Sequence, residues 1–146
     1  MTSPAPAFAA LLIGAHRLVL AQSDLRTLEP ADDVDRADPP AGGVGWIESA
    51  ARRWPVYNLD DHCLPSGTAT RQRRICALLA QGDARFALLC DDVQRLPPTA
   101  TRSYPLPPSM ALPLTPLRGV VAWGDQRAPL TSAAALTAHM SLQEPV

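Results

Sequence analysis

Short apolar runs alternate along the chain with segments rich in glycine, proline and charged residues. The apolar runs have the length and the aromatic or β-branched content of strands. The segment 45–59 organises the pattern, because its first arm begins at Trp46 and its second arm runs from Trp54 to Leu59. Small and charged residues between them, Ser49–Arg53, suit an exposed tip. The pattern predicts a hairpin here.

Three further strand pairs follow from the same pattern. The predicted pairs are 8–13 with 18–21, 73–80 with 84–92, and 117–123 with 127–130. Turns at Gln81-Gly82-Asp83 and Gly124-Asp125 support the last two pairs. The pair 73–92 is apolar on both faces, so it is expected to be the most buried. Its core is predicted to unite Ile75, Leu79, Phe86, Leu88 and Val121.

Helix is predicted at two places only. Ser23–Arg26 is expected to form a helical turn with Leu25 and Leu28 facing inward. Thr131 or Ser132 is expected to cap a terminal helix that runs through Met140. The segments 29–43, 60–74 and 97–116 are predicted to be connections, the last of them extended and rich in proline. The sequence therefore predicts a mainly antiparallel β protein.

Composition excludes several classes of function. The chain has 146 residues, 13 basic and 14 acidic side chains, a net charge of -1 and a pI near 6.3. Such a balance disfavours a nucleic-acid binder, which is usually basic. No apolar run is long enough to span a membrane. An odd number of cysteines, at positions 63, 76 and 90, favours free thiols and a reducing, cytoplasmic location.

The side chains best suited to metal binding or catalysis are adjacent at residues 60–63, which are Asp60, Asp61, His62 and Cys63. A metal site needs further ligands at suitable spacing, and His16 and His139 are isolated in the sequence. A small enzyme that uses Asp60, Asp61 and His62 is a distant alternative. We expect neither a metal nor another cofactor.

The order of the motifs resembles the CheW-like family, the coupling domain of bacterial chemotaxis. That family has the pattern Gly-x-Ile-x-x-Arg-Gly-x-x-x-Pro-Val-x-x-Leu, and this chain matches it at Gly45, Ile47, Pro55, Val56 and Leu59. Cys90-Asp91-Asp92-Val93 stands where the family has Val-Asp-x-Val, and the similarity extends over residues 8–140. Ala50-Ala51 occupies the position of the family's Arg-Gly pair, while Arg52-Arg53 follows two residues later. The chain is therefore similar to a divergent member.

The resemblance implies one CheW-like domain over residues 1–146, built of two five-stranded SH3-like barrels with a hydrophobic seam and a short C-terminal helix. It implies a non-enzymatic scaffold that links a chemoreceptor cytoplasmic tip to the regulatory domain of a histidine kinase, in chemotaxis or a related twitching pathway. Neither nucleic-acid binding nor membrane insertion is expected. A generic SH3-like or OB-like binding module is the alternative.

The predicted hairpin also carries the candidate partner-binding residues, which are Trp46, Arg52, Arg53 and Trp54. Arginine and tryptophan are enriched at the energetic centres of interfaces. The hypothesis is that Arg53 and Trp54 anchor an acidic, partly apolar partner surface. A solvated charge pair at a turn is the alternative.

Overall fold

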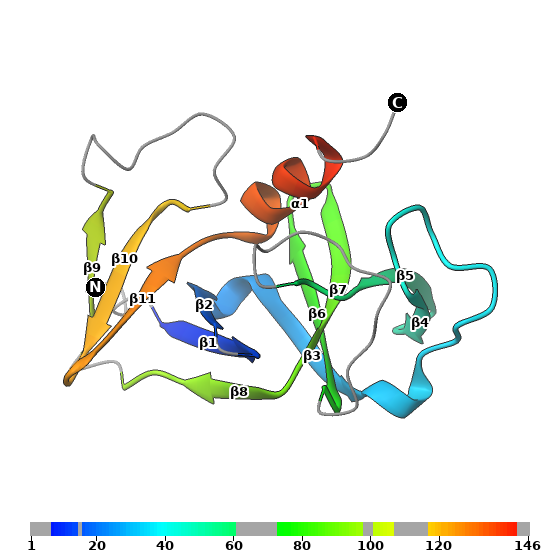
Figure 1. Cartoon of the computed structure of the whole chain (residues 1–146), viewed down its shortest axis with the longest axis horizontal. Helices are drawn as coiled ribbons and strands as arrows, with labels where there is room; N and C mark the ends of the chain where they lie inside the picture. Colours follow the sequence, from blue (N-terminus) through cyan, green and yellow to red (C-terminus); the bar gives the residue numbers. More distant parts are fainter. Residues whose placement is uncertain (1–6, 15, 61–72, 98–100, 107–116, 143–146) are drawn as a thin grey trace, which may run out of the picture.

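The first of two sheets, sheet A, is formed by the two ends of the chain. A computed structural model describes residues 7–14, 16–60, 73–97, 101–106 and 117–142. The strands of sheet A are β1 (Phe8–Ile13), β2 (His16–Ala21), β8 (Asp92–Arg95), β9 (Thr101–Pro105), β10 (Gly119–Trp123) and β11 (Gln126–Leu130). Their order is β8-β1-β2-β11-β10-β9, so β8 and β9 are the edges. This sheet occupies the left half of Figure 1.

Sheet B comes from the middle of the chain. Its strands are β3 (Leu25–Pro30), β4 (Gly45–Ser49), β5 (Arg52–Tyr57), β6 (Ile75–Gln81) and β7 (Ala84–Cys90), in the order β3-β6-β7-β5-β4. Short 3₁₀ turns, η1 (Gln22–Asp24) and η2 (Ala31–Asp33), flank β3. Just after η2, Asp35 pairs with Trp46 of β4 through two backbone hydrogen bonds of 2.7 and 2.8 Å. This bridge joins the two ends of the strand order and closes sheet B into a barrel.

Gly45 is required where that barrel closes. A Cβ atom at this position would lie only 2.3 Å from the backbone oxygen of Asp35. No other residue type fits without moving the backbone, since real Cβ atoms do not approach an oxygen so closely. The glycine of the family pattern therefore has a steric reason in this chain.

The buried side chains form three interiors. Sheet A encloses Phe8, Ala10, Val19, Leu96, Val121, Trp123 and Ala128. Sheet B encloses Val34, Val44, Ile47, Trp54, Val56, Cys76, Leu78, Ala80, Ala87 and Leu89. The third interior lies between the sheets and under the helix, and it contains Leu11, Leu20, Leu79, Phe86, Leu88 and Leu136 among others. Alternate residues of β6 and β7 thus pack into the sheet B barrel on one face and into the third interior on the other. We call this third interior the seam.

The terminal helix α1 (Ala133–Leu142) packs on β6 and β7, above the junction of the sheets in Figure 1. Three side chains, two of them distant in the sequence, accept hydrogen bonds from its first N–H groups. Ser132 Oγ accepts from Ala135 at 3.0 Å, as expected for an N-cap. Asp24 Oδ2, on a residue only 6% exposed, accepts from Ala133 at 3.1 Å. Gln81 Oε1 accepts from Ala134 at 2.9 Å.

The predicted fold class is confirmed: the protein is mainly β, with two barrel-like lobes and a short C-terminal helix. Sheet A has six described strands where five were expected. Two strand pairs, β5 with β7 and β2 with β11, are parallel. Parallel pairs join strands that are distant in sequence, which a hairpin-by-hairpin prediction does not capture.

Several local predictions were correct only in part. The helical turn predicted at Ser23–Arg26 is present as η1 but ends at Asp24, since Leu25 begins strand β3. Leu25 packs against the third interior as predicted, whereas Leu28 is 45% exposed because it lies on the outer side. The described residues 101–105 of the proline-rich connection form edge strand β9, which agrees with the extended conformation predicted for them. Proline is tolerated there because one side of an edge strand needs no ladder partner. The predicted core is divided, since Val121 lies inside sheet A whereas Leu79, Phe86 and Leu88 lie in the seam. Ile75 is only half-buried.

Candidate partner-binding hairpin and a separate surface hollow

The β4–β5 hairpin turns through two residues only. Ser49 pairs with Arg52, so Ala50 and Ala51 form the whole turn. Both have positive φ angles, 53° and 60°. Two consecutive residues of positive φ are the requirement of a type I′ turn, which normally uses asparagine and glycine. The expectation that Arg52 and Arg53 lie at the tip was wrong, because both belong to strand β5.

Alternation along β5 separates the predicted site residues. Trp54 points into the sheet B barrel, where it packs in the same cluster as Ile47 and is 6% exposed. Its indole Nε1 donates a hydrogen bond of 3.3 Å to the backbone oxygen of Ser49. Trp54 therefore fixes the hairpin from inside and has little surface to offer a partner.

Arg53 and Trp46 lie together on the outer face of the hairpin. The guanidinium carbon of Arg53 is 4.3 Å from the centroid of the Trp46 ring, which is a cation–π distance. The indole Nε1 of Trp46 donates a 2.8 Å hydrogen bond to the backbone oxygen of Asp38 and so fixes the ring. Of the four predicted partner-binding residues, the structure thus brings Trp46 and Arg53 together across the two strands.

Arg52 is exposed beside the turn. By alternation it lies on the Trp54 side of β5, away from Arg53. Arg85 of β7 lies over the ring of Trp54 at 5.7 Å. Arg52 and Arg53 therefore point to opposite faces of β5. Of these two, only Arg53 packs against an aromatic ring on the outer face.

The local cluster at residues 60–63 is only partly visible. Asp60 is half-buried, whereas Asp61, His62 and Cys63 lie outside the described residues. Among the described residues, no three histidine, cysteine, aspartate or glutamate side chains form a group that could hold a metal ion. The expectation that this cluster binds no metal therefore stays a prediction, and the small enzyme stays a distant alternative.

Cys76 and Cys90 are both buried and free. Burial raises the pKa of the Cys76 thiol to about 12, and the charge of Glu29 acts in the same direction. Burial also raises the pKa of Cys90 to about 12, with a smaller contribution from Cys76. A thiol that holds its proton so strongly is a poor nucleophile and a poor metal ligand, so these residues serve packing.

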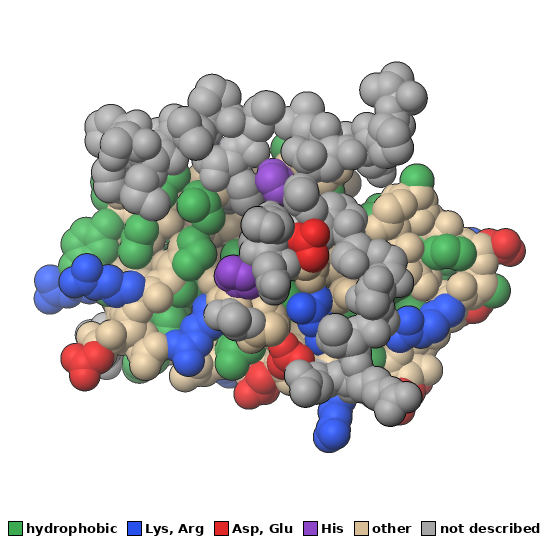
Figure 2. Space-filling view, viewed as in Figure 1, with side chains coloured by type: hydrophobic (Ala, Val, Ile, Leu, Met, Phe, Trp, Pro, Cys, Tyr) green, Lys and Arg blue, Asp and Glu red, His purple; other side chains and the backbone are tan. Residues whose placement is uncertain are grey.

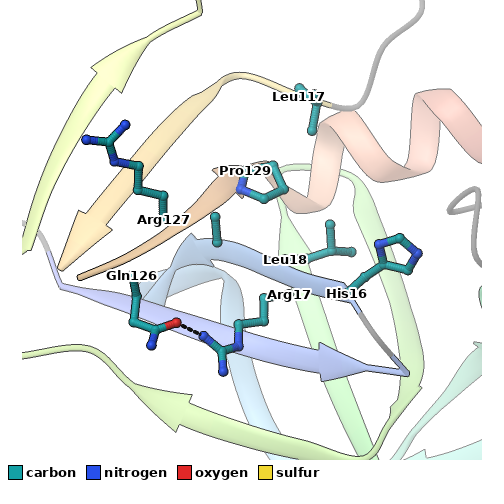
Figure 3. A pocket seen from close by; sticks show the side chains of 8 residues that line it. His16, Arg17, Leu18, Leu117, Gln126, Arg127 and Pro129 are labelled. Carbon is teal, nitrogen blue, oxygen red and sulfur yellow. Dashed lines mark hydrogen bonds between the residues drawn. The ribbon is translucent and has the colours of Figure 1, made fainter. Parts of the chain in front are cut away.

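A surface hollow of about 560 Å³ opens where β2 and β11 separate, and its residues were not among the predicted sites. It is lined by His16, Arg17, Leu18, Leu117, Gln126, Arg127, Ala128 and Pro129. In Figure 3 the side chains of Arg17 and Gln126 are joined by a hydrogen bond at one end, while His16 and Leu117 lie at the other.

Pro129 explains why these strands separate. β2 and β11 pair at Leu130 and Val19, where Thr131 N donates to Val19 O at 2.7 Å. In a parallel ladder the next such bond back along β11 would come from the N–H of residue 129 to the oxygen of residue 17. Proline has no N–H, so the ladder cannot continue. Pro129 lies within the predicted strand 127–130, so the sequence already contained an indication that this strand pairing would be interrupted.

Comparison with known proteins gives a structural match. The crystal structure of the scaffolding protein TtCheW from Thermoanaerobacter tengcongensis matches with a TM-score of 0.65 at 15% sequence identity. The match covers 88% of this chain and 89% of the other. The two-barrel fold expected from the resemblance is therefore confirmed over nearly the whole of both chains.

Sequence comparison adds nothing further. No protein-family model matches the chain, and no curated protein matches it. Within the described residues, no helix has the length and apolar character needed to cross a membrane.

Proposed function

We propose that this chain is a non-enzymatic signalling adaptor that links a chemoreceptor cytoplasmic tip to the regulatory domain of a histidine kinase. The pathway is chemotaxis or a related motility system such as twitching, and the location is the cytoplasm. The observation that carries the proposal is the match to a scaffolding protein over 88% of this chain and 89% of the other. Both barrels and the terminal helix are present, so the proposed unit is one domain over residues 1–146.

The proposed contact surface is the outer face of the β4–β5 hairpin, with Trp46 and Arg53 at its centre. Arg52 belongs to the other face of β5 and borders this surface at the turn. A guanidinium held against an indole ring loses less freedom on binding than a free arginine does, which favours affinity. The exposed positive charge suits a carboxylate on the partner, and the ring suits an apolar neighbour of that carboxylate. Trp54 supports this surface from the barrel interior.

The test is a binding measurement with three separate ligands. The purified chain is titrated calorimetrically with a kinase regulatory domain, with a receptor cytoplasmic tip fragment and with a single-stranded oligonucleotide. The proposal expects saturable binding of the two protein fragments and none of the oligonucleotide. Binding of the oligonucleotide alone would favour the OB-like module, and binding of neither protein would contradict the adaptor function.

A further inference from the structure

The outer face of β9, β10 and β11 carries a regular grid of side chains. Val120 of β10 pairs with Tyr104 on one side and with Pro129 on the other. Two residues along, Ala122 pairs with Arg102 and with Arg127. Residues that pair across strands share a face of the sheet. One apolar row, 104–120–129, therefore lies beside a row with an arginine at each end, and we call these six residues the arginine-bordered face.

This face points away from the barrel interior. Val121 and Ala128, which alternate with the residues of the grid, are buried inside sheet A. Tyr104 is 51% exposed, although a large aromatic side chain is usually well covered. A hollow of about 350 Å³ lies here, lined by Tyr104, Pro105, Val120, Ala122 and Arg127. Figure 2 shows hydrophobic side chains gathered over β9 and β10, with basic side chains beside them.

The charge on this face has one sign. Arg102 and Arg127 are both exposed, and within the described part of the chain neither guanidinium has an ion pair or a hydrogen bond. None of the six grid residues is acidic, and the nearest acidic residue along the sequence is Asp125, in the β10–β11 turn. The chain as a whole is slightly acidic, with a net charge of -1, so this local excess of positive charge is not a general property of its surface.

We propose that the arginine-bordered face binds an acidic segment of a partner protein, one that places apolar side chains in the hollow and carboxylates against Arg102 and Arg127. Complementary charge specifies the carboxylates, since guanidinium groups bind them in a planar, bidentate geometry. The apolar row specifies their aliphatic or aromatic neighbours. Tyr104 is the single aromatic residue of the face, whereas a single-stranded nucleic acid would need several stacking rings.

This surface is distinct from the hairpin surface proposed above. The grid lies on sheet A, and the Trp46–Arg53 pair lies on sheet B. The arginine-bordered face is defined by the register, exposure and charge of sheet A. Failure of the adaptor function would therefore leave this second surface unaffected.

The test is a selection from random short peptides displayed on phage, with the full chain as bait. The counter-selection uses the double variant Arg102→Glu/Arg127→Glu. We expect peptides rich in aspartate and glutamate beside leucine or phenylalanine to be enriched on the original chain. Synthetic copies are expected to bind the double variant at least about tenfold more weakly, a difference of about 1.4 kcal/mol. Tyr104→Ser is expected to weaken the same peptides.

A matched control reverses two exposed arginines elsewhere, Arg26→Glu/Arg36→Glu, and is expected to leave peptide affinity within about twofold. Enrichment that does not depend on Arg102 and Arg127, or no enrichment, would overturn the proposal. Two further outcomes would also overturn it. One is binding to phosphatidylglycerol vesicles that the double variant loses, without peptide binding. The other is a dimer in sedimentation that the double variant dissociates, which would assign the face to a second copy of the chain.

Discussion

The guanidinium of Arg53 lies against the indole ring of Trp46, 4.3 Å from its centroid, across the two strands of one hairpin. The register makes this contact diagonal, because Trp46 pairs with Pro55 while Arg53 pairs with Glu48. Diagonal neighbours on one face of an antiparallel pair are within reach of long and aromatic side chains. Trp54, the immediate neighbour of Arg53, points to the other face and is buried. The Arg53–Trp46 pair on the outer face therefore depends on a core residue for its position.

Reversal of the charge at Arg53 tests the proposed contact surface. Arg53→Glu is expected to leave folding intact and to lower affinity for the kinase or receptor fragment by about 2 kcal/mol, the loss typical of an interface centre. Arg53→Lys keeps the charge but loses the planar group, so a smaller loss is expected. Calorimetric titration measures both, with Arg26→Glu as a control on the exposed side of β3. Original affinity in Arg53→Glu would remove the hairpin from the partner surface.

The Ala50-Ala51 turn stores conformational strain. An L-residue in the left-handed region costs roughly 1–2 kcal/mol, and glycine avoids most of this cost. Ala51→Gly is therefore expected to raise the free energy of unfolding by about 0.5–1 kcal/mol, after the greater freedom of glycine in the unfolded chain is subtracted. Urea denaturation measures the change. Ala37→Gly, at an exposed position without positive φ, is the control and is expected to lower stability.

Phe86 belongs to the seam between the two lobes. Its side chain is 2% exposed and meets the ring of Tyr57 edge to face, with ring centroids 6.3 Å apart. Phe86→Ala is expected to lower the free energy of unfolding by about 3–5 kcal/mol, because it removes packing and leaves a cavity. An unfolding midpoint equal to that of the original chain would show that the seam contributes little to stability.

The two buried thiols make a pH-dependent contribution. Their pKa values in the folded protein are raised to about 12, whereas an unfolded cysteine titrates near about 8.5. Folding thus favours the protonated thiol, so this contribution is complete below the unfolded pKa and is lost as the pH rises towards 12. Stability measured between pH 8 and 10 is expected to fall less steeply in Cys76→Ala/Cys90→Ala.

Thiol labelling checks the same prediction directly. In a Cys63→Ser background, an aromatic disulfide reagent at pH 8 is expected to react with Cys76 and Cys90 only as fast as the protein unfolds. Rapid labelling of the native protein would show that these thiols are accessible and would contradict their assignment to the two interiors.

The strand pairs joined by tight turns were predictable, and the long-range pairings were not. Glycine and aspartate at positions 124 and 125 mark a turn locally, so the β10–β11 pair could be placed from the sequence. Asp35 pairs with Trp46 across a proline- and glycine-rich loop, and no local signal marks that bridge. β3 was missed because its burial alternates only between half-buried and exposed, without a strongly apolar face.

The candidate site was predictable in composition but not in arrangement. Periodicity showed that Phe86 and Val121 are inside, yet it cannot tell which of several interiors a residue occupies. In the same way, alternation separates Arg53 from Trp54, but only the strand register shows that Trp46 is the partner of Arg53. The arginine-bordered face also depends on register, because its residues come from three strands.

The central claim, that this chain couples two proteins, is tested most directly by co-sedimentation. Receptor cytoplasmic fragments are attached to vesicles and mixed with the kinase regulatory domain, with and without the chain. The adaptor function predicts that the kinase domain pellets with the vesicles only when the chain is present, and that Arg53→Glu reduces this recovery whereas Arg26→Glu does not. Recovery of the kinase domain that is independent of the chain, or absent in its presence, would contradict the account.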